Sequence, residues 1–404
     1  MIQIYSENIS SRLLYVLDFV FEGNYTITSF IHDLGDKKIL NYSTQKIEGK
    51  NQLWIIPSGL LEHDTVDEDY KHDFEHQDIL SSIFYILTRY EEYFAREKDH
   101  FERFTAKQSE CYALGKLDEP IVDEWVSELR RRFDLPVEFP YQFIPTFDID
   151  NAWAYKNKGQ FRTAASKSKD LIKSDRKRIS ERKAVLTGKM KDPYDTYDFI
   201  ESLSNWRPKV FFLLGDYGKY DRNIHFKNRE FRALIQKIDQ FADIGIHPSF
   251  SSFRDLGKMQ KEKERLEEIV GHEITRSRQH FLRLELPTTY LELEKIGIRE
   301  DYSMGYADHV GWRAGTSRPF LFFDLSQNRV TDLTVFPFQY MDGTLNEYMQ
   351  VNTEKAKEIV FDLSSKTQKF GGNFICLWHN ETIGNYEKWE GWKEVLNYNI
   401  SLNE

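Results

Sequence analysis

The feature that most constrains this chain is an apolar run that ends in two carboxylates, Phe143-Ile144-Pro145-Thr146-Phe147-Asp148-Ile149-Asp150. Alternating side chains of a strand point to the same face, so Asp148 and Asp150 could converge on one point. A buried strand that delivers two acids at its C-terminal end commonly supplies metal ligands and bases in α/β enzymes. The alternative is a strand followed by an Asp-rich turn, with Asp150 or Asn151 capping the next segment.

The composition is that of a globular protein with room for two domains. The chain has 404 residues, of which 40% are hydrophobic and 30% are charged. Residues 1–8 hold no basic stretch followed by an apolar one, and no apolar run reaches the roughly 18 residues that a membrane span requires. We therefore expect a cytoplasmic protein without a transmembrane segment. Cys111 and Cys376 lie too far apart to indicate a disulfide framework or a thiolate metal site.

The pattern of the chain changes near residue 138. Residues 1–138 indicate an N-terminal α/β domain without a catalytic constellation, in which 78–94 is predicted to form a buried helix capped by Asp78. Over residues 139–404, strand, loop and helix alternate, which favours a parallel α/β barrel or a doubly wound sheet. The predicted strands include Val210–Leu214, Ile244–His247, Phe281–Leu284 and Phe374–His379.

Residues with metal-binding or acid–base chemistry lie at the ends of several predicted strands. In chain order they are Asp148, Asp150, His247, His280, Arg313 and His379. A single His at a strand end is more often a structural residue. Taken together, however, the set supplies the ligands, the base, the acid and the fixed cation that metal-assisted hydrolysis requires.

Four segments that contain these residues resemble motifs of the polysaccharide deacetylases (NodB-type, carbohydrate esterase family 4). The members of that family are metal-dependent enzymes that remove acetyl groups from N-acetylated sugars. The similar segments are Thr146–Asp150, Gly245–Ser249, Trp312–Gly315 and Leu377–His379. SRQHFLR, DYSMGYAD and GWRAGT are similar to a bacterial subgroup with an additional N-terminal domain. The resemblance implies an irregular (β/α) barrel preceded by a smaller mixed α/β domain, acting on an acetylated polysaccharide or sugar precursor.

The resemblance also implies roles for individual residues. Asp148 would be the base, Arg313 would hold its carboxylate, and His379 would be the general acid. We further expect substrate contacts from Arg278, Arg283, Trp378 and Asn380.

The expected cofactor is a divalent metal, with zinc as the first choice. By resemblance, Asp150 and His247 are ligands, but Ser251 stands where the family has its second ligand histidine. His280, at the edge of a neighbouring predicted strand, is our candidate for the missing ligand. The alternative is that His280 and Arg278 hydrogen-bond substrate or brace the loop.

A basic insertion, residues 154–192, directly follows the acidic pair. Between Ala154 and Lys191 there are thirteen Lys and Arg against three Asp and Glu, whereas the whole chain has a net charge of −10. Apolar residues recur there at helical spacing and predict an amphipathic basic helix: Ile172, Ile179, Leu186 and Met190. This helix is either a solvated cover of the barrel or a surface for anionic glycans or a lipid-linked sugar. One basic segment in an acidic chain does not predict nucleic-acid binding.

Two other functions fit the same residues. One is a catalytically impaired relative that binds carbohydrate, which Ser251 and the supply of eight Trp and 22 Tyr support. The other is a hydrolase of C–N bonds in small non-sugar amides, since barrels of this kind support several such reactions.

Overall fold

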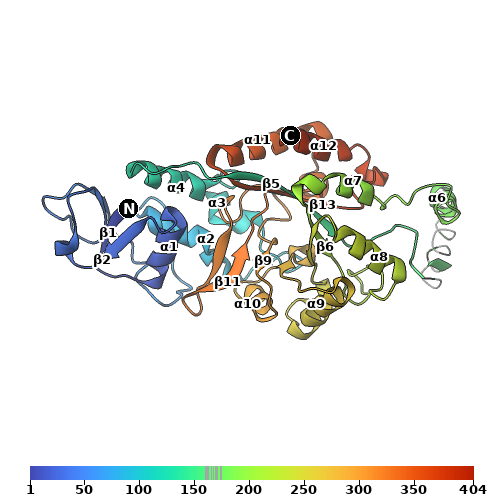
Figure 1. Ribbon diagram of the computed structural model, residues 1–404, viewed down its shortest axis with the longest axis horizontal. Helices are drawn as coiled ribbons and strands as arrows, with labels where there is room; N and C mark the ends of the chain where they lie inside the picture. Colours follow the sequence, from blue (N-terminus) through green and yellow to red (C-terminus); the bar gives the residue numbers. More distant parts are fainter. Residues whose placement is uncertain (160–162, 165, 167, 169–171, 173–174) are drawn as a thin grey trace.

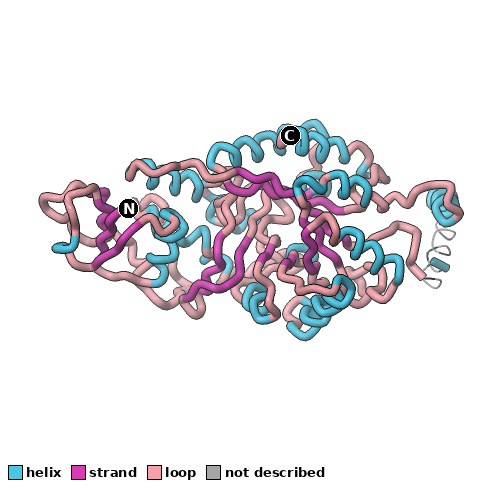
Figure 2. Tube along the Cα trace, viewed as in Figure 1, coloured by secondary structure: helices cyan, strands magenta, loops and turns pink. Residues whose placement is uncertain are grey.

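The computed structural model describes residues 1–404 except 160–162, 165, 167, 169–171 and 173–174. Its described strands form two sheets, one of four strands near the N-terminus and one of nine strands further along. Figure 1 shows the smaller sheet at one end of an elongated molecule and α6 (Arg176–Leu186) at the other. In Figure 2 the strands of the larger sheet run through the middle of the molecule, with helices on either side. Within the described ranges, no helix is both long and apolar enough to cross a lipid bilayer.

The N-terminal part is a parallel sheet packed against helices. Its strand order is β2-β1-β3-β4, with every neighbouring pair parallel. The side chains of Ser10 and Asp78 cap the first turns of α1 and α2 by accepting backbone hydrogen bonds. The predicted α/β character of this part is confirmed. The elements are β1 (Ile2–Ser6), α1 (Ser11–Phe21), β2 (Tyr25–Thr28), β3 (Ile39–Tyr42), β4 (Gln52–Ile55), α2 (Ile79–Leu87), α3 (Glu110–Ala113) and α4 (Ile121–Arg132).

Helix α2 ends earlier than the sequence predicts. Arg89 has a φ of 55°, in the left-handed region, and the 3-10 turn η2 (Tyr90–Glu92) follows it. The prediction of one helix over 78–94 is therefore wrong beyond Leu87. The chain turns back at Arg89 because its buried guanidinium pairs with Glu92, with Nε 2.6 Å from Oε1.

The larger sheet is centred on β5 (Tyr141–Ile149), the apolar strand that leads to the two carboxylates. Its order is β10-β11-β9-β8-β7-β6-β5-β13-β12, and all neighbours are parallel except β10 and β11. In the β5–β13 register, Asp148 lies beside His379. The predicted α/β class with a mostly parallel sheet is confirmed. The other strands are β6 (Lys209–Phe212), β7 (Asp243–Ile246), β8 (Arg276–Ser277), β9 (Glu300–Asp301), β10 (Phe320–Asp324), β11 (Arg329–Val335), β12 (Tyr340–Met341) and β13 (Gly372–His379).

Helices cover this sheet on both sides. In Figure 1, α11 and α12 run together along one side, and α8, α9 and α10 lie on the other. Their bounds, with that of the short α7, are α7 (Tyr197–Ser202), α8 (Arg229–Ile238), α9 (Leu256–Val270), α10 (Thr288–Lys295), α11 (Thr353–Phe370) and α12 (Lys393–Ser401).

One predicted strand of this part, Phe281–Leu284, is a turn. The strand at this position is the shorter β8, and the 3-10 turn η6 (His280–Leu282) follows it. Phe281 and Leu282 have φ values of 60° and 55°. Two successive residues in the left-handed region end extended structure, so the prediction of a strand here is wrong.

The two parts of the chain pack into one hydrophobic core. The segment Gly311–Arg318 of the larger part lies against the N-terminal part, where Trp312 N donates to Leu117 O at 3.0 Å and Ser317 N donates to Asp123 Oδ2 at 2.7 Å. At Gly311, where φ is 114°, a Cβ would lie 2.2 Å from Leu117 O, so this approach requires glycine. The domain boundary expected from the sequence stays a prediction.

The basic insertion lies partly outside the described residues. Its described helix α6 buries Arg182 and Val185. The predicted amphipathic helix does not extend to Met190, because α6 ends at Leu186, and Ile172, Leu186 and Met190 are 84%, 42% and 38% exposed. The expected contact with an anionic surface stays a prediction.

Candidate active site

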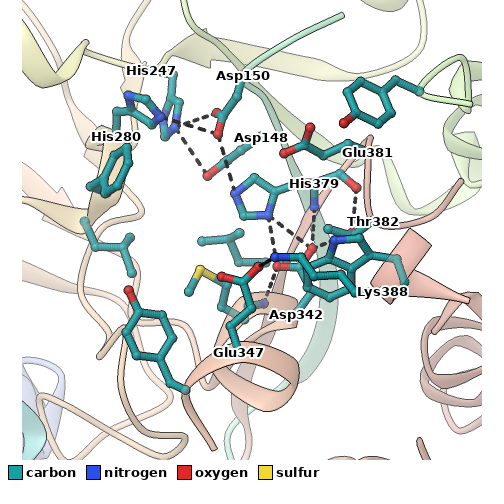
Figure 3. Close-up of a pocket in the computed structure, with 18 of the residues that line it drawn as sticks. Asp148, Asp150, His247, His280, Asp342, Glu347, His379, Glu381, Thr382 and Lys388 are labelled. Carbon is teal, nitrogen blue, oxygen red and sulfur yellow. Dashed lines mark hydrogen bonds and ion pairs between the residues drawn. The ribbon is translucent and has the colours of Figure 1, made fainter. Parts of the chain in front are cut away.

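The ends of neighbouring strands bring the acid and histidine residues to one cavity of about 420 Å³. Because the carboxyl ends of parallel strands meet at one edge of a sheet, β5, β7, β8 and β13 deliver their following residues to the same place. Figure 3 shows the five side chains that converge there: Asp148, Asp150, His247, His280 and His379.

Asp150, His247 and His280 form a group that could hold a metal ion. One ligand atom of each lies within 4.8 Å of the others. The two Nε2 atoms face Asp150, at 3.2 Å from Oδ1 for His247 and 3.4 Å from Oδ2 for His280. The His247 Nδ1–H donates to the carbonyl of Arg278 at 2.6 Å, and that of His280 to Asp221 Oδ1 at 3.1 Å.

The chemistry of this donor set fits zinc. Each imidazole has its Nδ1 engaged, which leaves the Nε2 lone pair for a cation, and the carboxylate provides the third donor. Burial opposes charge on His280, but the carboxylates of Asp150 and Asp221 outweigh it and raise the pKa of His280 to about 9, so a bound cation would have to displace the proton on its Nε2. Where the resemblance expects the second ligand, Ser251 instead places its hydroxyl 3.1 Å from Ser249 Oγ. His280, which comes from a different strand end, lies with Asp150 and His247 in the group that could hold a metal ion.

The guanidinium beside Asp148 belongs to Arg278. Its Nη1 donates to Asp148 Oδ1 at 2.9 Å, and its Nε donates to Tyr302 O at 3.0 Å. The expectation that Arg313 holds Asp148 is corrected, because buried Arg313 forms an ion pair with Glu92 of η2. Glu92 comes from the N-terminal part, so this pairing depends on how the two parts pack.

His379 is held by Asp342, which follows β12. The His379 Nδ1–H donates to Asp342 Oδ1 at 2.9 Å, and its backbone N donates to Oδ2 at 2.8 Å. Its Nε2 points toward the metal-ligand group, 3.9 Å from Asp150 Oδ2. Burial lowers the pKa of His379, but Asp342, Asp150 and Asp148 outweigh burial and raise it well above the usual range.

The predicted substrate contacts do not face the cavity. Arg278 is committed to Asp148, and Arg283 pairs with Glu102. The indole N–H of Trp378 donates to Tyr340 OH, and the side-chain amide of Asn380 donates to Tyr194 O. All four of these predicted residues are buried, and none of them is among the described residues that line the cavity: Arg278, Arg283, Trp378 and Asn380.

Other residues line the cavity that the sequence analysis did not single out. The Gln279 side chain is 2% exposed, and its Nε2 meets no hydrogen-bond acceptor among the residues that the structure describes. Glu381 lies near His379 (Figure 3), where burial and the Asp150 carboxylate raise its pKa. Aromatic side chains complete the walls: Tyr194, Phe281, Tyr348, Tyr386 and Trp389.

The sequence could have indicated some of the site residues that were missed, but not others. Gln279 and Glu381 lie one and two residues from predicted site histidines, so a search along the strand ends would have included them. Asp221 belongs to a loop between β6 and α8, and Asp342 follows a strand of two residues. Such short elements carry no periodic pattern that could predict them.

Comparisons with known proteins give one family match, which is confined to the N-terminal region. Residues 2–134 match the model of a family of unknown function (DUF7033). None of the curated proteins matches the chain. Solved structures also match the chain, at identities of 9–14% and TM-scores below 0.5. These structures include one designated a polysaccharide deacetylase from Mycobacterium smegmatis (TM-score 0.41, 14% identity, 66% of this chain and 86% of that chain), the polysaccharide deacetylase Bc1974 from Bacillus cereus (TM-score 0.32, 11%, 65% and 88%) and PuuE allantoinase (TM-score 0.39, 9%, 64% and 84%).

Proposed function

We propose that this chain is a metal-dependent deacetylase that hydrolyses the N-acetyl group of a polysaccharide or a sugar precursor. The observation that carries the proposal is the convergence of one carboxylate and two imidazoles, with a further carboxylate and a further imidazole close to them, in one cavity. The choice of an N-acetylated sugar follows the motif resemblance. The aromatic walls also support this choice, because flat apolar rings pack well against sugars.

Asp150, His247 and His280 would hold the ion, and zinc is the metal that this donor set favours. A bound divalent cation polarises a carbonyl group and lowers the pKa of a water molecule toward about 7. The second contacts of the two histidines, to Arg278 O and to Asp221, fix their ring orientation before any ion binds.

Asp148 takes the proton of the attacking water. Its Oδ1 is held by Arg278, which orients the carboxylate, and its Oδ2 lies 3.7 Å from His247 Nε2, next to the metal-ligand group. Water adds to the acetyl carbon as its proton passes to Asp148.

His379 then protonates the leaving nitrogen. The C–N bond breaks, acetate departs, and the sugar leaves as an amine. His379 suits this step because Asp342 and the nearby carboxylates keep its imidazole protonated, with Nε2 directed toward the cavity. The proton on Asp148 returns to solvent or to His379 before the next cycle.

The proposal is tested with full-length protein stripped of metal by a chelator and then reloaded with zinc. We expect stoichiometric zinc and release of acetate from a chitooligosaccharide, both measured directly. His280→Ala should weaken zinc binding by more than about 10–100-fold, which is the effect of losing a residue that only supports a ligand. The matched control is His272→Ala, at a half-exposed surface histidine paired with Asp239.

Three outcomes of this experiment separate the alternatives. Zinc binding without release of acetate would contradict the deacetylase and favour a carbohydrate-binding or small-amide function. Wild-type zinc affinity in His280→Ala would remove His280 from the ligand set. Absence of zinc from the reloaded wild-type protein would contradict the metal centre as a whole.

Gln279 should contribute a hydrogen bond to substrate. Its buried amide nitrogen faces no acceptor in the described structure, so an oxygen of the bound sugar or acetyl group would satisfy it. Gln279→Ala should lower kcat/KM by about 3–10-fold, the value of one neutral hydrogen bond, without changing zinc content. Gln260→Ala, at a partly exposed glutamine of α9, is the control, and equal kcat/KM in the two variants would contradict the assignment.

A further inference from the structure

A turn of the N-terminal region lies against the turn that carries His280. The N-terminal turn, Asp99–Arg103, belongs to the segment that matches the family of unknown function. It packs on η6, which follows β8 and begins with His280. Three kinds of contact join the two turns: hydrogen bonds, an ion pair and ring packing.

The polar contacts run in both directions. Arg103 Nη1 donates to the backbone carbonyl of Phe281 at 3.2 Å, and Arg283 Nε donates to the backbone carbonyl of Phe101 at 3.0 Å. Arg283 also forms an ion pair with Glu102. The Phe101 ring lies 4.8 Å from the Phe281 ring, between centroids.

The N-terminal turn is itself fixed. The Asp99 carboxylate accepts hydrogen bonds from Phe101 N at 2.8 Å, from Arg103 N at 2.9 Å and from Arg103 Nε at 2.8 Å. Arg103 is buried, and its Nη2 donates to Tyr348 OH at 2.9 Å on the wall of the cavity. A rigid partner therefore meets the His280 turn on the side of the cavity.

The His280 turn needs such a partner because its backbone is strained. Phe281 and Leu282 both have left-handed φ values, which residues other than glycine adopt rarely and keep only where their surroundings hold them. Arg103 donates its hydrogen bond to the carbonyl of Phe281, one of the two residues with a left-handed φ. Without this bond, the backbone of Phe281 and Leu282 could relax toward ordinary φ values. That movement would displace His280, the adjacent residue.

We propose that the Asp99–Arg103 turn positions His280 for metal binding, so that the N-terminal region is a working part of the metal centre and of the cavity wall. The inference rests on the proposed function, because it takes His280 as a ligand. It assigns Arg103 and Phe101 as positioning residues, which act on the metal through the His280 turn.

The test uses full-length Arg103→Lys and Phe101→Ala. Lysine keeps a positive charge beside Asp99 but cannot reach both the Phe281 carbonyl and the Tyr348 hydroxyl as the guanidinium fork does. The Phe101 side chain is uncharged and only partly buried, so its truncation leaves no buried charge unpaired. The matched controls in the same region are Arg96→Lys, at an exposed surface pair, and Phe30→Ala, at an exposed ring.

Two readouts are measured, zinc affinity by competition with a chelator and amide hydrogen exchange of residues 278–284 in the zinc-free protein. We expect both test variants to bind zinc roughly 10-fold more weakly than the controls and to exchange faster over these residues. Control-like values for both readouts in both variants would overturn the inference while leaving the proposed function intact. A wild-type protein that binds no zinc would overturn the proposed function, and this inference with it.

Discussion

Asp148→Asn should lower the turnover of acetylated substrate by about 10²–10⁴-fold, the usual cost of removing a general base. Asparagine has the shape of aspartate and still offers an oxygen to Arg278 Nη1, so the geometry beside the metal-ligand group is preserved. It cannot take a proton from water, however. The expected protein is therefore folded and loaded with zinc but nearly inactive, as measured by acetate release, zinc analysis and circular dichroism.

A second buried aspartate provides the control for this variant. Asp123 of α4 accepts hydrogen bonds from the Thr316 hydroxyl and Ser317 N, and it is not among the described residues that line the cavity. Asp123→Asn makes the same chemical change and should retain turnover. Near-native activity in Asp148→Asn would rule out Asp148 as the base. Loss of zinc in Asp148→Asn would mean that Asp148 serves the metal instead.

Glu92→Gln should reduce the free energy of unfolding by about 3–5 kcal/mol, because it removes the carboxylate that pairs with buried Arg313 and one of the two that pair with buried Arg89. Glu92 pairs with both Arg89 and Arg313, and all three side chains are almost fully buried. Glutamine keeps the size of the side chain but leaves positive charge without a counterion in the core. Urea unfolding at neutral pH measures the change in free energy.

The same variant distinguishes a structural role of Arg313 from the catalytic one that the resemblance implies. We expect the folded fraction of Glu92→Gln, and of Arg313→Met, to keep the turnover of the wild-type protein. Glu128→Gln, at an exposed pair with Arg132, should leave stability unchanged and serves as the control. A stable Arg313→Met protein with lost turnover would instead return Arg313 to the catalytic machinery.

The sequence was informative where position along a strand decides position in space. Asp148 and Asp150 end an apolar strand, and His247 and His379 follow predicted strands, so the geometry of a parallel sheet predicts that all four meet at one edge. The structure brings them to one cavity. Their chemical roles stay predictions.

The partner of Asp148 could not be predicted in this way. Arg278 directly follows β8, whereas Arg313 lies in the loop between β9 and β10, where it pairs with Glu92, a residue more than 180 positions from either. Packing of the N-terminal part against the larger sheet decides this pairing, and no local pattern records it. The same holds for Asp221, whose contact with His280 joins a loop to a turn.

In the basic insertion, by contrast, the sequence contains a periodic pattern that the structure does not follow. Spacing predicted an amphipathic basic helix that reaches Met190, yet α6 ends at Leu186 and buries Val185, which is not one of the apolar residues of that pattern. Lys and Arg are so frequent in this segment that its few apolar residues can follow a helical period by chance.

The segment Gly311–Arg318 limits how this protein can be divided or recombined. Its backbone N–H groups donate hydrogen bonds to Leu117 O and Asp123 Oδ2, and at Gly311 the two segments of the chain approach too closely for any side chain. A fragment starting at residue 139 would leave those groups without their partners and expose apolar surface to self-association. Replacement of residues 1–138 by those of a relative should therefore succeed only when the relative's counterpart of Gly311–Arg318 is introduced as well. These two segments together are the smallest unit that can be exchanged.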